Sequence, residues 1–111
     1  EGCEVIITSG GLSVDPDDVT REGVRTAGAE IVSYGSPVLP GAMFLNARLG
    51  DVPIVGLPAC VFFSPRTIYD LMLPRVLADL PPTAAEIAAM GHGGLCMECE
   101  VCHFPVCPFG R

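Results

Sequence analysis

The sequence contains no lysine and no tryptophan, and none of its apolar runs is long. The missing lysine excludes a P-loop nucleotide site, because that motif needs a lysine to reach the phosphates. The chain carries 13 acidic residues against 6 basic ones, a net charge of −7, which argues against nucleic-acid binding because such surfaces carry a basic patch. No stretch approaches the roughly 18 consecutive apolar residues of a membrane span, so no membrane association is expected.

The N-terminus lacks the charged, apolar and small-residue order of a secretory signal. Six cysteines without such a signal favour metal ligands over disulfides, because reducing compartments keep thiols free. A cytoplasmic location is therefore expected. The chain starts at Glu1 and reaches its first apolar run almost at once, so we expect it to be a piece of a longer protein.

Half of the residues are apolar, which is enough for the core of one domain. The apolar runs predict strands at residues 4–8, 30–34, 42–49 and 53–57, and helices at 19–29, 64–80 and from 83. Because strands alternate with helices and the strands are apolar on both faces, the pattern predicts an α/β fold. We expect a mostly parallel sheet covered by helices.

Polar residues mark the expected helix starts. Asp17 and Asp18 are expected to open the first helix, where carboxylates complement the positive end of the dipole. Ser64 before Pro65 predicts the N-cap and first position of the second helix. Thr83, with Glu86 three residues later, predicts a capping box for the third helix.

The stretch ITSGGLSVDPDD, residues 7–18, follows the first expected strand. Gly10 and Gly11 allow the backbone to approach a ligand closely or to adopt a positive φ. Thr8, Ser9 and Ser13 add hydroxyl groups to the same loop. These residues could contact a phosphate, or they could form an ordinary turn.

Three carboxylates in this stretch, Asp15, Asp17 and Asp18, complicate the phosphate interpretation. They repel an anion unless a cation such as Mg²⁺ lies between them. The residues alone therefore leave three interpretations open. The loop could bind a phosphate-bearing ligand together with a metal, hold a proton-handling carboxylate, or only cap a helix.

The same stretch resembles the TSGG-S-V-x-x-x-D motif of the molybdopterin-binding domain shared by MoeA, MogA and gephyrin. The segment VLPGAMFLNARLGDVPIVGLPA, residues 38–59, resembles the Pro-Gly loop, strand and GLPGNP loop of that family, in the same order. TIYDLMLPRVLADL resembles the helix that follows. The resemblance covers about residues 4–80, and its specificity comes from the ordered set of motifs.

The resemblance implies that residues 1–82 form the C-terminal portion of a three-layer α/β domain whose N-terminal half is absent. It implies molybdopterin, or its nucleotide, as ligand and a role in molybdenum cofactor biosynthesis, by molybdate insertion or cofactor delivery. Homodimers and molybdenum-enzyme clients are the implied protein partners. By matching position, Asp18 falls at the functional aspartate, and the ligand-binding positions are Thr8, Ser9, Gly10, Gly11, Ser13, Asp15, Pro40, Gly41, Pro58, Ala59 and Cys60.

The chain departs from the family pattern at four positions in these loops. Ala42 stands where the MoeA branch has a lysine, Ala59 and Cys60 replace the Gly and Asn of GLPGNP, and Asp15 stands where the family tends to have glycine. Cys60 could present a soft thiolate to molybdenum or be a small core residue. Both a molybdopterin molybdotransferase-like enzyme and a non-catalytic carrier or metal and redox sensor therefore remain open.

The last segment, residues 83–111, combines the short helix with a cysteine-rich tail. Cys96, Cys99, Cys102 and Cys107 have the spacing C-x2-C-x2-C-x4-C, which predicts a metal centre. Four thiolates suit zinc or a [4Fe–4S] cluster, whose ferredoxin run has one residue fewer before its last Cys-Pro. We expect the metal to staple the tail. An α/β scaffold whose zinc tail docks a partner protein is the third hypothesis.

Overall fold

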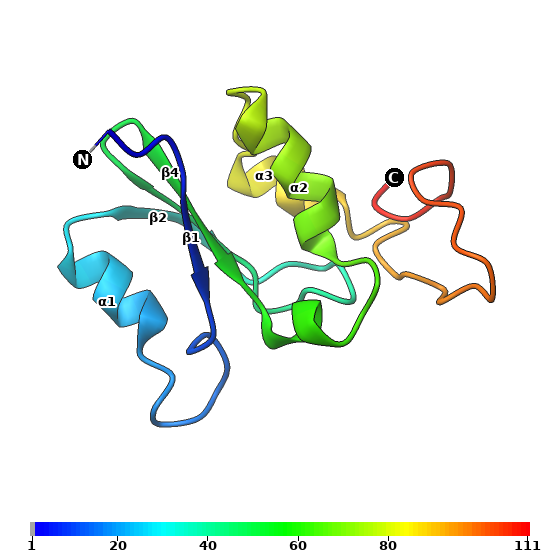
Figure 1. The fold of residues 1–111 in the computed structure, drawn as a ribbon, viewed down its shortest axis with the longest axis horizontal. Coiled ribbons are helices and arrows are strands. Elements are labelled where there is room, and N and C mark those ends of the chain that lie inside the picture. Colours follow the sequence, from blue (N-terminus) through cyan, green and yellow to red (C-terminus); the bar gives the residue numbers. More distant parts are fainter. Residues whose placement is uncertain (1) are drawn as a thin grey trace.

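The computed structural model describes residues 2–111 and has three layers (Figure 1). Helix α1 covers one face of a central sheet, and α2 and α3 cover the other. The elements are β1 (Ile6–Ser9), α1 (Thr20–Thr26), β2 (Glu30–Tyr34), β3 (Leu45–Leu49), β4 (Val52–Leu57), the 3₁₀ helix η1 (Ala59–Phe62), α2 (Ile68–Leu77) and α3 (Ala84–Ala89). The predicted α/β class is therefore correct.

The sheet has the strand order β1-β4-β3-β2, and only the β1–β4 pair is parallel. The prediction of a mostly parallel sheet is wrong. Gly50, at φ +62°, lies in the short turn that joins β3 to β4, and such a turn produces an antiparallel hairpin. The apolar runs reflected burial on both faces of the sheet, which does not fix strand direction.

The main core lies between the sheet and the two helices α2 and α3. Its buried residues are Val38, Phe44, Val55, Ile68, Met72, Val76, Ile87 and Phe109. A smaller cluster of Ala29, Ala47 and Ile54 lies under α1. Ile87 and Phe109 come from the segment 83–111, so that segment shares one core with the sheet.

Helix α2 begins three residues later than predicted from Ser64 and Pro65, because Thr67 forms the cap. The Thr67 side-chain oxygen accepts a hydrogen bond from the Tyr69 N–H at 3.1 Å. In return, an Asp70 carboxylate oxygen accepts one from the Thr67 N–H at 2.8 Å. This two-way capping box satisfies otherwise unpaired N–H groups. Ser64 could not form such a box, because the residue three positions later is Thr67 and not an acid.

The other helices test the remaining cap predictions. Asp17 and Asp18 precede α1 and do not open it; its N-cap is Val19, whose side chain makes no capping bond. The capping box at Thr83 is confirmed, because the Glu86 N–H donates to the Thr83 hydroxyl oxygen at 3.2 Å. Within residues 2–111 no helix is long and apolar enough to cross a membrane.

Replacing Thr67 with valine should destabilise the fold by about 1 kcal/mol, the usual cost of losing an N-cap oxygen. Valine has nearly the same shape, so the 2 % exposed site stays filled and only the cap is lost. Thr67→Ser keeps the oxygen and should recover most of the cap. Urea unfolding of both variants measures the difference, and equal midpoints for the two would contradict the capping role.

Candidate functional site

The parallel strands β1 and β4 end at the same edge of the sheet (Figure 1). A cavity of about 510 Å³ lies beyond these ends. The crevice beyond the carboxyl ends of parallel strands is where α/β folds bind ligands. Three loops line it, and we call it the loop cavity. Its lining residues are Gly10, Gly11, Leu12, Ser13, Asp15, Asp18, Leu39, Pro40, Gly41, Ala42, Met43, Leu57, Pro58, Ala59 and Cys60.

The first loop leaves β1 through Gly10 and Gly11, at φ +80° and +67°. Thr20, the first residue of α1, closes the loop. Its N–H donates to the Gly11 carbonyl at 3.0 Å, and its hydroxyl donates to the Gly10 carbonyl at 2.8 Å. A Cβ on Gly11 would lie 2.2 Å from the Thr20 hydroxyl oxygen, so this close approach requires glycine.

Leu12 fixes the first loop to the sheet. Its side chain is 3 % exposed and packs over Gly56, where a Cβ would come within 2.8 Å of it. The Tyr34 hydroxyl donates a hydrogen bond to the Leu12 carbonyl. The guanidinium carbon of Arg21 lies 4.4 Å from the centre of the Tyr34 ring. These contacts hold one wall of the loop cavity in place.

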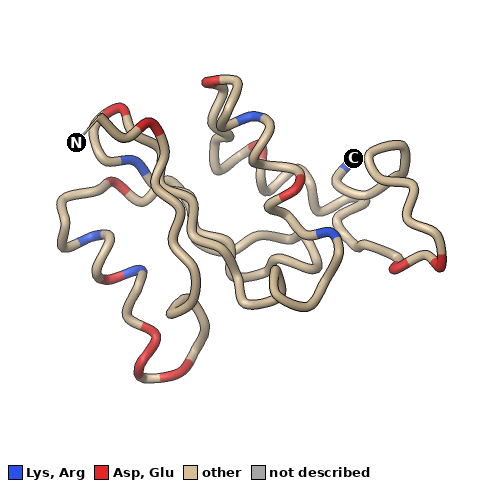
Figure 2. The backbone as a smooth tube through the Cα atoms, in the orientation of Figure 1, with Lys and Arg blue, Asp and Glu red and all other residues tan. Residues whose placement is uncertain are grey.

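The charge of the loop cavity is negative. Asp18 is half-buried and Asp15 is exposed. The Asp18 carboxylate accepts a hydrogen bond from the Asp15 N–H at 3.1 Å, and this bond holds the two residues close to each other. Figure 2 shows acidic residues on this loop between β1 and α1. None of the lining residues is basic, so an anionic group in the cavity meets two carboxylates and no cationic side chain.

The second loop is held from two sides. The Ile68 N–H at the start of α2 donates to the Pro40 carbonyl at 3.0 Å. Gly41 has φ +135°, and a Cβ there would lie 2.4 Å from the Ile68 Cγ2. On the other side, the Leu39 N–H donates to the Gly94 carbonyl at 2.8 Å and the Cys96 N–H donates to the Leu39 carbonyl at 2.7 Å. Residues of the tail therefore support the cavity wall.

The third loop follows β4 and contains Pro58, which is buried, and Cys60, which is partly exposed in η1. Burial raises the pKa of the Cys60 thiol above its usual range. A free cysteine ordinarily has a pKa of about 8.5, so the Cys60 thiol stays protonated at neutral pH. It lines the cavity as a weakly polar thiol, and not as a preformed thiolate.

The structure brings most of the sequence-predicted site residues together. Asp18 and nine of the ligand-binding positions line the loop cavity, whereas Thr8 and Ser9 lie in β1 outside the lining. Sequence reasoning missed the apolar lining residues Leu12, Leu39, Met43 and Leu57. The sequence held one signal for Leu12, which is an apolar residue directly after two glycines. It held no signal for Leu39, because the position of Leu39 depends on its pairing with Leu95 in the distant tail.

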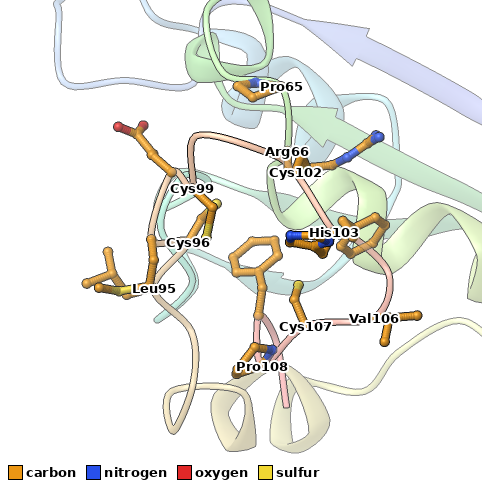
Figure 3. A pocket seen from close by; sticks show the side chains of 14 residues that line it. Pro65, Arg66, Leu95, Cys96, Cys99, Cys102, His103, Val106, Cys107 and Pro108 are labelled. Carbon is orange, nitrogen blue, oxygen red and sulfur yellow. The ribbon is translucent and has the colours of Figure 1, made fainter.

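The cysteine tail has a second cavity, of about 280 Å³, which we call the cysteine cavity (Figure 3). Cys96, Cys99, Cys102 and Cys107 all line it as free thiols. Among residues 2–111, however, no three His, Cys, Asp or Glu side chains form a group that could hold a metal ion. Neither the predicted metal centre of the tail, zinc or [4Fe–4S], nor the predicted Mg²⁺ position on the aspartates is therefore preformed as an ion site in the described residues.

The chain was compared with known protein families and curated proteins. Residues 1–78 match a family described as "Probable molybdopterin binding domain". The match includes all three loops of the loop cavity and ends before the cysteine tail. No curated protein matches the chain.

Proposed function

This chain belongs to the molybdopterin-binding domain family, and on that premise we propose that its loop cavity binds molybdopterin or its nucleotide during molybdenum cofactor assembly. One observation carries the proposal. Three loops that are far apart in the sequence line a single cavity beyond β1 and β4, and they are the loops whose motifs resemble the family. A volume of about 510 Å³ lies within the roughly 300–1,000 Å³ of small-molecule sites.

Backbone groups are the proposed phosphate ligands. Gly10 and Gly11 have no side chains and form a tight turn that the hydrogen bonds from Thr20 close. A phosphate can therefore approach their main chain closely. Ser13 is exposed in the same loop and can donate its hydroxyl. The apolar residues Met43 and Leu57 provide surface for the flat pterin ring.

Asp15 and Asp18 fit a divalent cation that arrives with the ligand. Mg²⁺ is commonly held by one or two carboxylates together with substrate phosphates, because it keeps several of its waters. Two aspartates alone do not form a complete ion site, which agrees with the lack of a preformed group among the described residues. A bound phosphate would supply the missing oxygens and offset the repulsion between the anion and the carboxylates.

The cavity supports two versions of this role. Asp18 at the position of the family's functional aspartate favours molybdate insertion, with molybdate as second substrate. Ala42 at the lysine position leaves the lining without a basic group for an oxyanion, which favours carrying the cofactor to a molybdenum enzyme. Turnover assays with molybdate and molybdopterin separate the two, because only the inserting enzyme forms molybdenum cofactor.

The binding proposal is tested on protein purified without oxygen. Oxidation should release about one fluorescent pterin derivative per chain, either as isolated or after incubation with molybdopterin. Ala59→Phe should abolish this uptake, because Ala59 is exposed and lines the cavity, so that the ring fills space the ligand needs. Ala85→Phe is the matched control on the exposed side of α3. Absence of pterin in the unsubstituted protein would rule the proposal out.

A further inference from the structure

The geometry points to the cysteine cavity as the site of an iron–sulfur cluster of the [4Fe–4S] type, ligated by Cys96, Cys99, Cys102 and Cys107. This site lies outside the family match, which ends at residue 78. None of the four proposed ligands lines the loop cavity, so the cluster site does not rest on the proposed function.

The tail is a loop closed at both ends, although residues 91–111 contain no helix or strand longer than a single bridge. The Gly110 N–H donates to the Gly93 carbonyl at 2.8 Å. A Cβ on Gly93 would lie 2.4 Å from the Arg111 carbonyl oxygen, so the two ends meet closely. Phe109 is 5 % exposed in the main core and anchors the loop. The cysteines therefore sit on a segment whose ends are fixed.

Between these fixed ends the loop has little core of its own. Met97 and Val106 are 75 % and 83 % exposed. Cys96 and Cys107 pack against the main core, whereas Cys99 and Cys102 are exposed. A segment that buries so little apolar surface needs another staple to keep one conformation. Metal ligation by four thiolates supplies one.

The four cysteines share one cavity, and a cluster and a single ion make different demands on thiols arranged in this way. A zinc ion requires four sulfurs at about 2.3 Å from one point. Here all four cysteines line one cavity of about 280 Å³ together with ten other residues, and among residues 2–111 no three His, Cys, Asp or Glu side chains form a group for one metal ion. A [4Fe–4S] cluster takes one thiolate on each of four irons, so its ligands lie farther from one another than the four ligands of a zinc ion.

The other lining residues suit a cluster. Phe104 and Phe109 lie edge to face, with their ring centroids 6.4 Å apart, and both line the cavity. Arg66 is the one arginine among the lining residues. Its guanidinium carbon lies 5.1 Å from the centre of the Phe104 ring, and Figure 3 shows the Arg66 side chain near Cys102. Apolar surroundings, hydrogen bonds to sulfur and nearby charge are the means by which proteins set cluster potentials.

The test measures iron, acid-labile sulfide and zinc in the whole chain, as isolated without oxygen and after incubation with ferrous iron and sulfide. About four irons and four sulfides per chain are expected for a [4Fe–4S] centre, with the paramagnetic signal of a reduced cluster after dithionite. One zinc per chain without sulfide would overturn the proposal. So would the absence of both metals after reconstitution.

Cysteine substitutions test whether the cluster lies in the tail. Cys99→Ser should lower bound iron at least several-fold, because Cys99 is exposed and its loss does not disturb the core. Cys3→Ser is the matched control, since Cys3 is also exposed and does not line the cavity. Equal iron in both variants would contradict ligation by the tail. If Cys99→Ser does not fold, the iron and sulfide content of the unsubstituted chain decides alone.

Discussion

Gly41→Ala should destabilise this small domain by roughly 3 kcal/mol, when overpacking and left-handed backbone strain are combined. The added Cβ would lie 2.4 Å from Ile68 Cγ2 and 2.7 Å from Ile68 Cβ. Ile68 is fully buried and cannot move aside without opening the core. Its N–H also holds the Pro40 carbonyl, so the same change should loosen the loop cavity. Denaturant unfolding followed by circular dichroism gives the loss.

Gly50→Ala is the matched control for this change. Gly50 also has a positive φ, +62°, but a Cβ there would meet nothing within 4 Å. It should therefore show only the backbone strain, about 1–2 kcal/mol. The difference between the two variants isolates the contact with Ile68. Equal losses would mean that the start of α2 does not constrain the Pro-Gly loop as described.

Asp18→Asn should remove the effect of Mg²⁺ on pterin binding while leaving the loop folded. An asparagine oxygen can still accept the hydrogen bond from the Asp15 N–H, now 3.1 Å long, but it carries no charge. In the unsubstituted protein, Mg²⁺ should tighten molybdopterin binding by about tenfold or more, because a metal between the phosphate and the carboxylates replaces repulsion by attraction. Titration of the pterin with and without Mg²⁺ measures both affinities.

Two comparisons make the result on Asp18 specific. Asp18→Ala loses the charge and the hydrogen bond, so it should also weaken binding in the absence of Mg²⁺. Asp17→Asn removes a neighbouring charge that does not line the cavity, and it should leave the Mg²⁺ effect intact. If Asp18→Asn retains both the full Mg²⁺ effect and molybdenum transfer, Asp18 does not hold the cation.

Local signals in the sequence were sufficient for several elements. The bounds of β2 match the prediction, because an apolar β-branched run there ends at a glycine. Thr83 with Glu86 predicted the start of α3, since all partners of a capping box lie within four residues. The start of α2 was misplaced because two cap signals, Ser64 and Thr67, lie close together. Only the second has an acid three residues later.

Features that depend on distant partners could not be predicted in this way. Strand direction followed from the β3–β4 turn and not from the burial pattern. The family resemblance identified the three cavity loops, but it did not indicate that Leu39 pairs with the tail. The cysteine spacing predicted that four thiols gather around one place. It could not show that Phe109 joins the main core and also lines the same cavity.

The anchoring of the tail also means that the limits of the family and of the cooperative folding unit differ. The family match ends at residue 78, whereas the main core includes Ile87 and Phe109, and the buried Asn46 of β3 donates its amide to the Pro82 carbonyl at 2.8 Å. A protein shortened to residues 1–78 would lose these contacts and expose the part of the main core that Ile87 and Phe109 cover. Evolutionary exchange of this tail would therefore require matching changes in the core.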